Sequence, residues 1–115
     1  MSIATLIAKA GHTLTHQRRN DDRGGSGGRE ANWDTLATGV ACWVQPASGR
    51  VQEAAARRDM VVSHSVYLTT DLDALADDRL VADTGDDETH TLLVRGQVDL
   101  AGLRRCWRID CEEKL

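Results

Sequence analysis

The sequence contains no Phe, a single Tyr, a single Pro and three Trp among its 115 residues. The hydrophobic core must therefore be built from aliphatic side chains around a few tryptophans. A domain of this length can bury about two-thirds of its unfolded surface, so one core is possible without covalent staples. We expect a single domain that spans residues 1–115.

Cysteine and long apolar runs are also scarce. Cys42, Cys106 and Cys111 are too few, and odd in number, for a disulfide framework. No segment approaches the ~20 apolar residues of a membrane span, and the opening MSIATLIAK lacks the basic start of a secretory signal. These absences predict a reduced, cytoplasmic setting with no membrane partner.

A basic excess is missing as well, because the formal net charge is -4. A protein that grips nucleic acid along its phosphates needs a basic excess or a basic stripe, so this class is disfavoured. A protein that DNA merely passes is not excluded by this charge. The basic residues that are present occur in local groups, such as Arg57 and Arg58.

What the sequence does contain is a series of short alternating segments, typical of β-strands with one apolar face. Strands are predicted at 12–19, 33–44, 59–70, 79–83, 89–97 and 104–113. Their short connections predict a mainly β fold, a small antiparallel β-barrel or a sandwich of about six strands, with one or two short helices. Six side chains are predicted to form the core: Trp43, Val62, Val66, Leu68, Trp107 and Ile109.

The long strand predicted at 33–44 has two faces and one interruption. Strict alternation would place Leu36 on one face with Val40, Cys42 and Val44. Gly39 interrupts this strand and is a candidate for a bulge or a bend. His64 lies on the apolar face of the next strand, where a packed, hydrogen-bonded core histidine is the expected role.

Three segments outside the strands are candidates for function. Residues 1–10 are predicted to form an arm or short helix that ends near Gly11, and residues 48–58 to form a short helical insert after Pro46. Between them, residues 20–32 form a flexible Gly-rich loop, too long for a tight hairpin turn. The residues proposed for a channel or for docking on a neighbour are Arg23, Gly24, Gly25, Ser26, Gly27, Gly28 and Arg29. Those proposed for a subunit interface are Ile3, Leu6, Ile7, Arg57 and Arg58.

No chemical motif supports catalysis, a metal or a cofactor. Cys106 and Cys111 fall on opposite faces of a strand, and His12 and His16 would lie ~13 Å apart. The acidic clusters at 71–78 and 83–88 lack the spacing of an EF-hand loop and are interpreted as solvated turns. We therefore expect a binding or structural protein rather than an enzyme.

The order of these segments resembles a known family. A basic strand THQRR is followed by a Gly-rich loop, then by WDTLATGVACWVQPASGR, an Ala-rich insert and SHSVYLTT. This order is similar to that of the head–tail joining, or head-closure, proteins of long-tailed bacteriophages. The residues that carry the likeness are Trp33, Leu36, Ala37, Trp43, Val44, Ser48, Gly49, Arg50 and His64.

The resemblance implies a structural virion protein, assembled in the cytoplasm of the bacterial host. Such a protein forms a homo-oligomeric ring, usually a dodecamer, between the portal or adaptor and the tail-completion protein. The ring retains packaged DNA, which passes through its channel without sequence-specific binding. The alternative is a small OB-like barrel that binds nucleic acid by stacking bases on exposed aromatic residues, for which Trp33 and Trp43 are the candidates.

Overall fold

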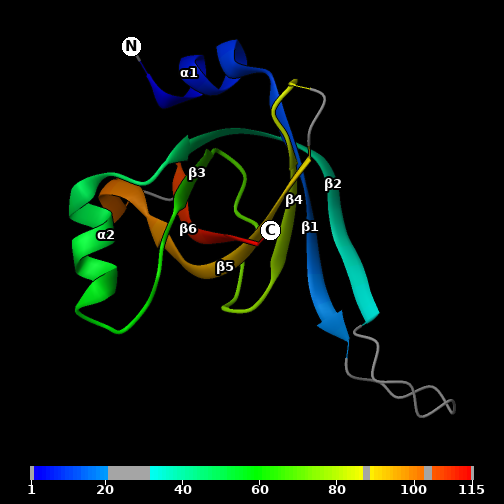
Figure 1. The fold of residues 1–115 in the computed structure, drawn as a ribbon. Coiled ribbons are helices and arrows are strands. Elements are labelled where there is room, and N and C mark those ends of the chain that lie inside the picture. The colour runs from blue at the N-terminus through cyan, green and yellow to red at the C-terminus, as the bar shows by residue number, and fades with distance from the viewer. Residues whose placement is uncertain (1, 21–31, 87–88, 103–104, 115) are drawn as a thin grey trace, which may run out of the picture.

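The computed structural model describes residues 2–20, 32–86, 89–102 and 105–114 of the chain (Figure 1). Two α-helices, six strands and one 3₁₀ turn make up this part. In chain order they are α1 (Ile3–Ala10), β1 (His12–Asn20), β2 (Asn32–Pro46), α2 (Gly49–Ala56), β3 (His64–Leu68), β4 (Arg79–Asp83), β5 (Thr89–Asp99), the 3₁₀ turn η1 (Leu100–Gly102) and β6 (Trp107–Lys114).

The six strands close into a barrel in the order β1-β2-β3-β6-β5-β4, with every neighbouring pair antiparallel. Closure depends on β1, which pairs with β2 on one side and with β4 on the other. The prediction of a mainly β fold with a small antiparallel barrel and two short helices is confirmed, and of the two architectures it left open, the barrel is correct.

Both helices begin and end at residues that cap them. The Ser2 side chain accepts a hydrogen bond from the Thr5 N–H at 3.2 Å, and Ser48 accepts one from Val51 N–H at 3.3 Å. These bonds satisfy amide groups that a helix start leaves without a partner. Gly11 ends α1 in a left-handed conformation with φ +67°, in which glycine has no steric penalty.

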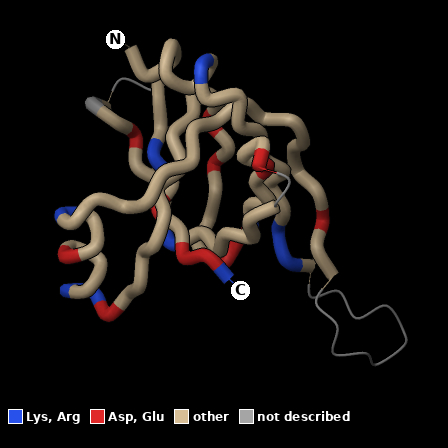
Figure 2. The backbone as a smooth tube through the Cα atoms, turned by 45° about the horizontal axis from the view of Figure 1, so that its top comes forward, with Lys and Arg blue, Asp and Glu red and all other residues tan. Residues whose placement is uncertain are grey.

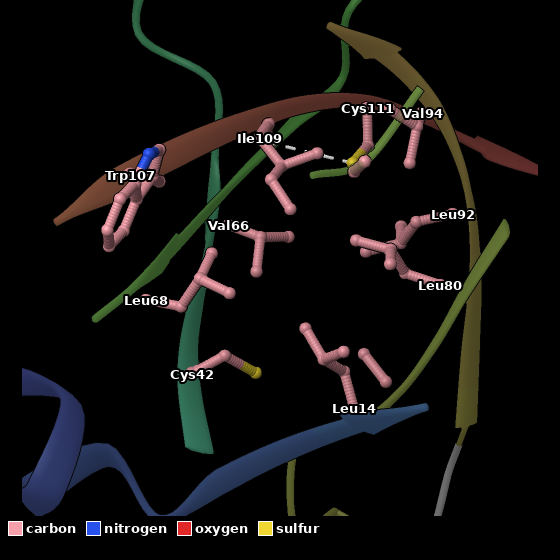
Figure 3. Packing of buried hydrophobic residues seen from close by; sticks show 12 residues of the cluster. Leu14, Cys42, Val66, Leu68, Leu80, Leu92, Val94, Trp107, Ile109 and Cys111 are labelled. Atoms are coloured by element: carbon pink, nitrogen blue, oxygen red, sulfur yellow. Dashed lines mark hydrogen bonds between the residues drawn. The ribbon is translucent and has the colours of Figure 1, made fainter. Parts of the chain in front are cut away.

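The barrel interior is filled by apolar side chains from all six strands (Figure 3). Leu14 from β1 and Leu80 from β4 meet side chains that β3, β5 and β6 project inward at alternate positions. The labelled residues of this cluster are Leu14, Cys42, Val66, Leu68, Leu80, Leu92, Val94, Trp107, Ile109 and Cys111. The four predicted core residues of β3 and β6 all lie in this cluster.

The other two predicted core residues lie elsewhere. Val62 is buried, with 5% of its surface exposed, but in a second small cluster with Ala47 and Ala55 of the α2 region. Trp43 is only half-buried and packs outside the barrel against its cross-strand partner Tyr67, with ring centroids 5.4 Å apart. The placement of Trp43 in the core was therefore wrong.

The face on which Leu36 lies has a structural cause in the register of β2. The pairing with β1 shifts twice, on either side of the pair His16 and Ala37, so that β2 contains extra residues relative to β1. Gly39 lies in one of these irregularities with φ +62°, as its candidacy for a bulge anticipated. The shifts break strict alternation, so Leu36 does not join Cys42 in the interior and is 49% exposed.

The hairpin of β1 and β2 extends past the body of the barrel. β4 pairs with β1 only over residues 13–17, and β3 pairs with β2 only over residues 43–46. Residues 32–41 of β2 are thus paired on the β1 side alone among the described strands. Figure 1 shows this hairpin on one side of the barrel and α2 on the other.

The bulge at Gly39 generates a testable prediction. No atom lies within 4 Å of a Cβ built at this position, so Gly39→Ala should be destabilising only through its left-handed backbone. We expect a loss of about 1 kcal/mol in the free energy of unfolding, measured by urea denaturation. Gly49→Ala is the matched control, because Gly49 also has open space but an ordinary φ and starts a helix. An equal loss in both variants would contradict the role assigned to the Gly39 backbone.

Candidate assembly surfaces

The helix α2 is joined to the barrel by a small contact of its own. Ala47, Ala55 and Val62 form its buried cluster, with Val51 and Met60 packed beside them. None of these residues belongs to the cluster inside the barrel. Burial of so little apolar surface contributes modestly to stability, because hydrophobic stabilisation scales with the area removed from water.

A groove of about 280 Å³ runs between α2 and the outer face of β5 and β6. Val51, Met60 and Val98 supply apolar surface in it, and Val98 is 39% exposed. Guanidinium groups come from both walls, with Arg58 beside α2 and Arg95 on β5. Arg95 is paired with Glu112, whereas Arg58 is exposed.

Three arginines of the α2 segment are exposed: Arg50, Arg57 and Arg58. Their side chains form no hydrogen bond or ion pair with the described part of the chain. Arg57 and Arg58 follow the last turn, where positive charge is favourable against the helix dipole by at most about 1 kcal/mol. That interaction leaves their guanidinium donors available to a partner. In Figure 2, backbone positions of Lys or Arg lie in the α2 segment at the edge of the molecule.

A second exposed surface lies on β2, on the opposite side of the barrel. We call the exposed part of this strand, Asp34 to Thr38 with the unpaired edge beside it, the β2 flank. Leu36 is its exposed apolar side chain, and the Asp34 carboxylate has no hydrogen bond or ion pair with the described residues. Unpaired strand edges attract other chains unless bulges, charges or a cover block them.

The base of the hairpin is fixed by a buried carboxylate, Asp78, of which 3% is exposed. His16 Nε2 lies 2.8 Å from Asp78 Oδ2, and Arg18 donates from Nε at 3.1 Å and from a terminal nitrogen at 3.0 Å. The Leu75 N–H donates to the same carboxylate at 2.9 Å. The Asp78 carbonyl accepts from Val94 N–H at 2.8 Å, so β1, the turn before β4 and β5 meet at one residue.

These contacts control the charge of Asp78. Burial alone would raise the pKa of this carboxyl, but hydrogen bonds from Arg18, from Leu75 N–H and from His16 outweigh it and hold the pKa below its ordinary value. The acidic turn was interpreted as wholly solvated, and that interpretation was wrong for Asp78.

His16, rather than His64, is the fully buried histidine of the barrel, whereas His64 is half-buried and lies 2.9 Å from the Ser63 hydroxyl.

The two half-buried tryptophans of β2, Trp33 and Trp43, do not share one stacking surface. Arg79 lies over the Trp33 ring, 4.2 Å from its centroid, while Trp43 packs against Tyr67. Ten residues of β2 separate the two rings, which corresponds to roughly 30 Å along a strand. Each ring is also already in contact with another side chain, which leaves less of its face for a base.

The N-terminal helix α1 covers one end of the barrel and packs against β2 and β3. Ile7 is buried in this packing, with 4% exposed, so it contacts its own subunit. Ile3 and Leu6 are half-buried and keep part of their apolar surface accessible. Of the three apolar residues proposed for an interface, these two therefore remain available to a partner.

Two of the three cysteines, Cys42 and Cys111, lie in the cluster inside the barrel. Burial raises the pKa of Cys42 to about 12 and that of Cys111 further, so both thiols are held protonated and are poor nucleophiles or ligands. Within ranges 2–20, 32–86, 89–102 and 105–114, no three His, Cys, Asp or Glu side chains are grouped to hold a metal ion. No helix in these ranges has the length and apolar character needed to cross a membrane.

The structure brings together some of the predicted site residues and not others. Arg57 and Arg58 are exposed together beside α2, as the sequence suggested. The residues proposed in the Gly-rich loop, Arg23 to Arg29, lie outside the described part of the chain. The groove and the β2 flank were missed, since the first joins segments distant in sequence and the second follows from the bulges.

The network at Asp78 predicts a specific dependence of stability on pH. Asp78→Asn removes the charged acceptor of the hydrogen bonds from Arg18, from Leu75 N–H and from His16, and should lower the free energy of unfolding by about 2 kcal/mol at pH 7. Because the pKa of Asp78 is lower in the folded state, its contribution is present above about pH 4 and is lost as the pH falls through the folded-state value. The gap between wild type and variant should therefore narrow in acid, as measured by urea denaturation between pH 7 and pH 3.

The neighbouring Asp77 provides the control for this experiment. Its side chain is 78% exposed and it has a positive φ that asparagine tolerates. Asp77→Asn should change the free energy of unfolding by less than about 0.5 kcal/mol. Equal losses in the two variants, or a gap that does not change with pH, would show that Asp78 is not the compensated charge described above.

The chain is similar over most of its length to one known protein family. The model of a family described as phage head completion protein matches residues 6–114, nearly the whole chain. No curated protein matches the chain. The resemblance to phage head-closure proteins is confirmed by this match. The chain belongs to the phage head completion protein family, and it is a structural protein of the phage head.

Proposed function

We propose that this protein is a head–tail connector subunit whose copies form a ring, expected to be a dodecamer, between the portal or adaptor and the tail-completion protein. The ring retains packaged DNA in the virion after assembly in the host cytoplasm, and it catalyses no reaction. Membership of the phage head completion family supports a structural role in the phage head. The proposal that copies of the chain contact one another rests on three exposed arginines of the α2 segment, which lack partners in the described chain.

The α2 segment displays more positive charge than the contacts within its own subunit use. A short helix that buries one alanine adds little to its own subunit, yet it displays Arg50, Arg57 and Arg58 beside a partly apolar groove. Arginine is the cation favoured at protein interfaces, because its planar guanidinium pairs with carboxylates in two places. A contact between subunits uses such a surface, whereas the fold of the monomer does not need it.

The charge of the chain supports passage of DNA rather than its capture. The net charge of -4 gives no general attraction for phosphates, so a ring of such subunits would let the duplex move through it. We propose that the Gly-rich segment 20–32, which carries Arg23 and Arg29, lines the channel or docks on a neighbour. Ile3 and Leu6 of α1 are proposed to contact the adaptor or a neighbouring subunit.

The role of α2 is tested by reversing its charge. The variant Arg57→Glu with Arg58→Glu should keep the circular dichroism spectrum and stability of the monomer, because both side chains are exposed. Its incorporation into particles should fall about tenfold or more, since a loss of about 1.4 kcal/mol per contact already has that effect. Incorporation is measured by quantitative mass spectrometry of purified phage particles, and DNA retention by nuclease protection.

The matched control keeps the charge at the same positions. Arg57→Lys with Arg58→Lys should assemble nearly as well as wild type if the positive charge is what matters. Loss of folding in the glutamate variant would instead assign α2 to the core. Full incorporation of the glutamate variant, with DNA retained, would remove the support that α2 gives to the ring.

The Gly-rich segment is tested separately by deletion of residues 24–28. We expect particles that still contain the protein but release DNA or fail to join tails, because the body of the barrel lies outside the deleted residues. The variant Arg23→Ser with Arg29→Ser keeps the length of the segment and removes these two charges, so it separates the effect of charge from that of length. Particles that keep DNA and tails after deletion would end this part of the proposal.

A further inference from the structure

The proposed ring leaves open which surface of the next subunit receives α2. A closed ring is built from head-to-tail contacts, so each copy must carry two different surfaces on different sides. Figures 1 and 2 place α2 at one side of the barrel and the hairpin of β1 and β2 at the other. The molecule thus displays two exposed surfaces in the arrangement that a head-to-tail contact requires.

We propose that the groove beside α2 in one copy receives the β2 flank of the next copy, with Leu36 entering the groove and Asp34 pairing with Arg57 or Arg58. This inference rests on the proposed function, because it assumes that copies of the chain assemble with one another. The occupant is a second copy of this chain rather than an unrelated partner, for the reasons of shape and charge given next.

The two surfaces are complementary in their apolar parts. Leu36 is 49% exposed on a strand whose register shifts turn it away from the barrel. The groove exposes apolar side chains that the fold leaves partly uncovered, with Val51 and Met60 half-buried and Val98 39% exposed. A leucine that enters such a groove removes apolar surface of both copies from water.

Their charges are complementary as well. The carboxylate of Asp34 and the guanidinium groups of Arg57 and Arg58 all lack partners in the described part of the chain. Pairing across the contact would therefore not break any ion pair described within a subunit. Complementary charges at an interface also fix register and disfavour wrong contacts.

The same features argue against simple strand addition at the free edge. The two register shifts in β2 lie within residues 35–40, in the middle of the unpaired edge. Bulges and exposed charges are devices that prevent regular pairing with another strand. The β2 flank is thus better suited to docking by its side chains than to extension of the sheet.

Disulfide trapping tests the contact directly. The full-length chain with Leu36→Cys and Ala54→Cys places one thiol on the β2 flank and one on α2 beside the groove. A Cys106→Ser background removes the one natural cysteine that is not buried. After mild oxidation of purified particles, we expect a ladder of covalent multimers on non-reducing gels, which reductant converts to monomer.

The control pair keeps Leu36→Cys and moves the second thiol to Ala56→Cys, an exposed position of α2 that does not line the groove. It should give no ladder. Particles that contain the protein and DNA but give no more multimers with the test pair than with the control pair overturn this inference and leave the proposed function intact. Absence of the wild-type protein from purified particles overturns the proposed function, and this inference with it.

A charge exchange provides an independent readout. Asp34→Arg alone, and Arg57→Asp with Arg58→Asp alone, should each reduce incorporation about tenfold while the monomer stays folded. The combination should recover at least about threefold, because the opposite charges face one another again. Reductions that simply multiply, with no recovery, would contradict the pairing of Asp34 with the arginines of α2.

Discussion

The buried carboxylate of Asp78 is the interaction on which the geometry of this molecule depends. The carboxylate accepts hydrogen bonds from His16 and Arg18 of β1 and from the backbone of the turn before β4. The backbone carbonyl of the same residue accepts one from Val94 of β5. A buried charge is tolerated only when such partners compensate it, so these elements must keep their relative positions. Since β1 continues from this point into the hairpin, Asp78 also fixes the direction in which the hairpin leaves the barrel.

A closed barrel leaves few surfaces for assembly. Its strands pair their backbone hydrogen-bonding groups with those of neighbouring strands, and its inward apolar side chains form one interior cluster. In the proposed ring, contacts with other subunits would fall to the parts that closure leaves over, which are α1, α2 and the unpaired flank of β2. Because α2 and the β2 flank contribute little to the interior, their charges and apolar side chains can serve assembly without a large cost in stability.

Much of the fold could be predicted from the sequence, because period-two alternation marks strands whose one face is buried. β4 was predicted at its observed bounds, and the inward side chains of β6, including Trp107 and Ile109, were assigned correctly. The alternation failed in β2, where bulges change the face that a side chain points to, so Leu36 was misplaced. Trp43 does alternate with the inward-facing Cys42, but neither face of this strand is polar, so the pattern did not show which face was buried. Asp78 was missed because nothing local distinguishes it from Asp77, and its partner His16 is 62 residues away in the chain.

The central proposal is that this barrel forms a ring at the junction of head and tail. Cryo-electron microscopy of the neck of DNA-filled particles tests that claim most directly. It predicts a closed ring of these barrels between the portal or adaptor and the tail, with α2 of each copy against the β2 flank of the next. The proposal would be contradicted if the density between portal and tail did not fit the barrel. It would also be contradicted if the protein were found only elsewhere in the particle.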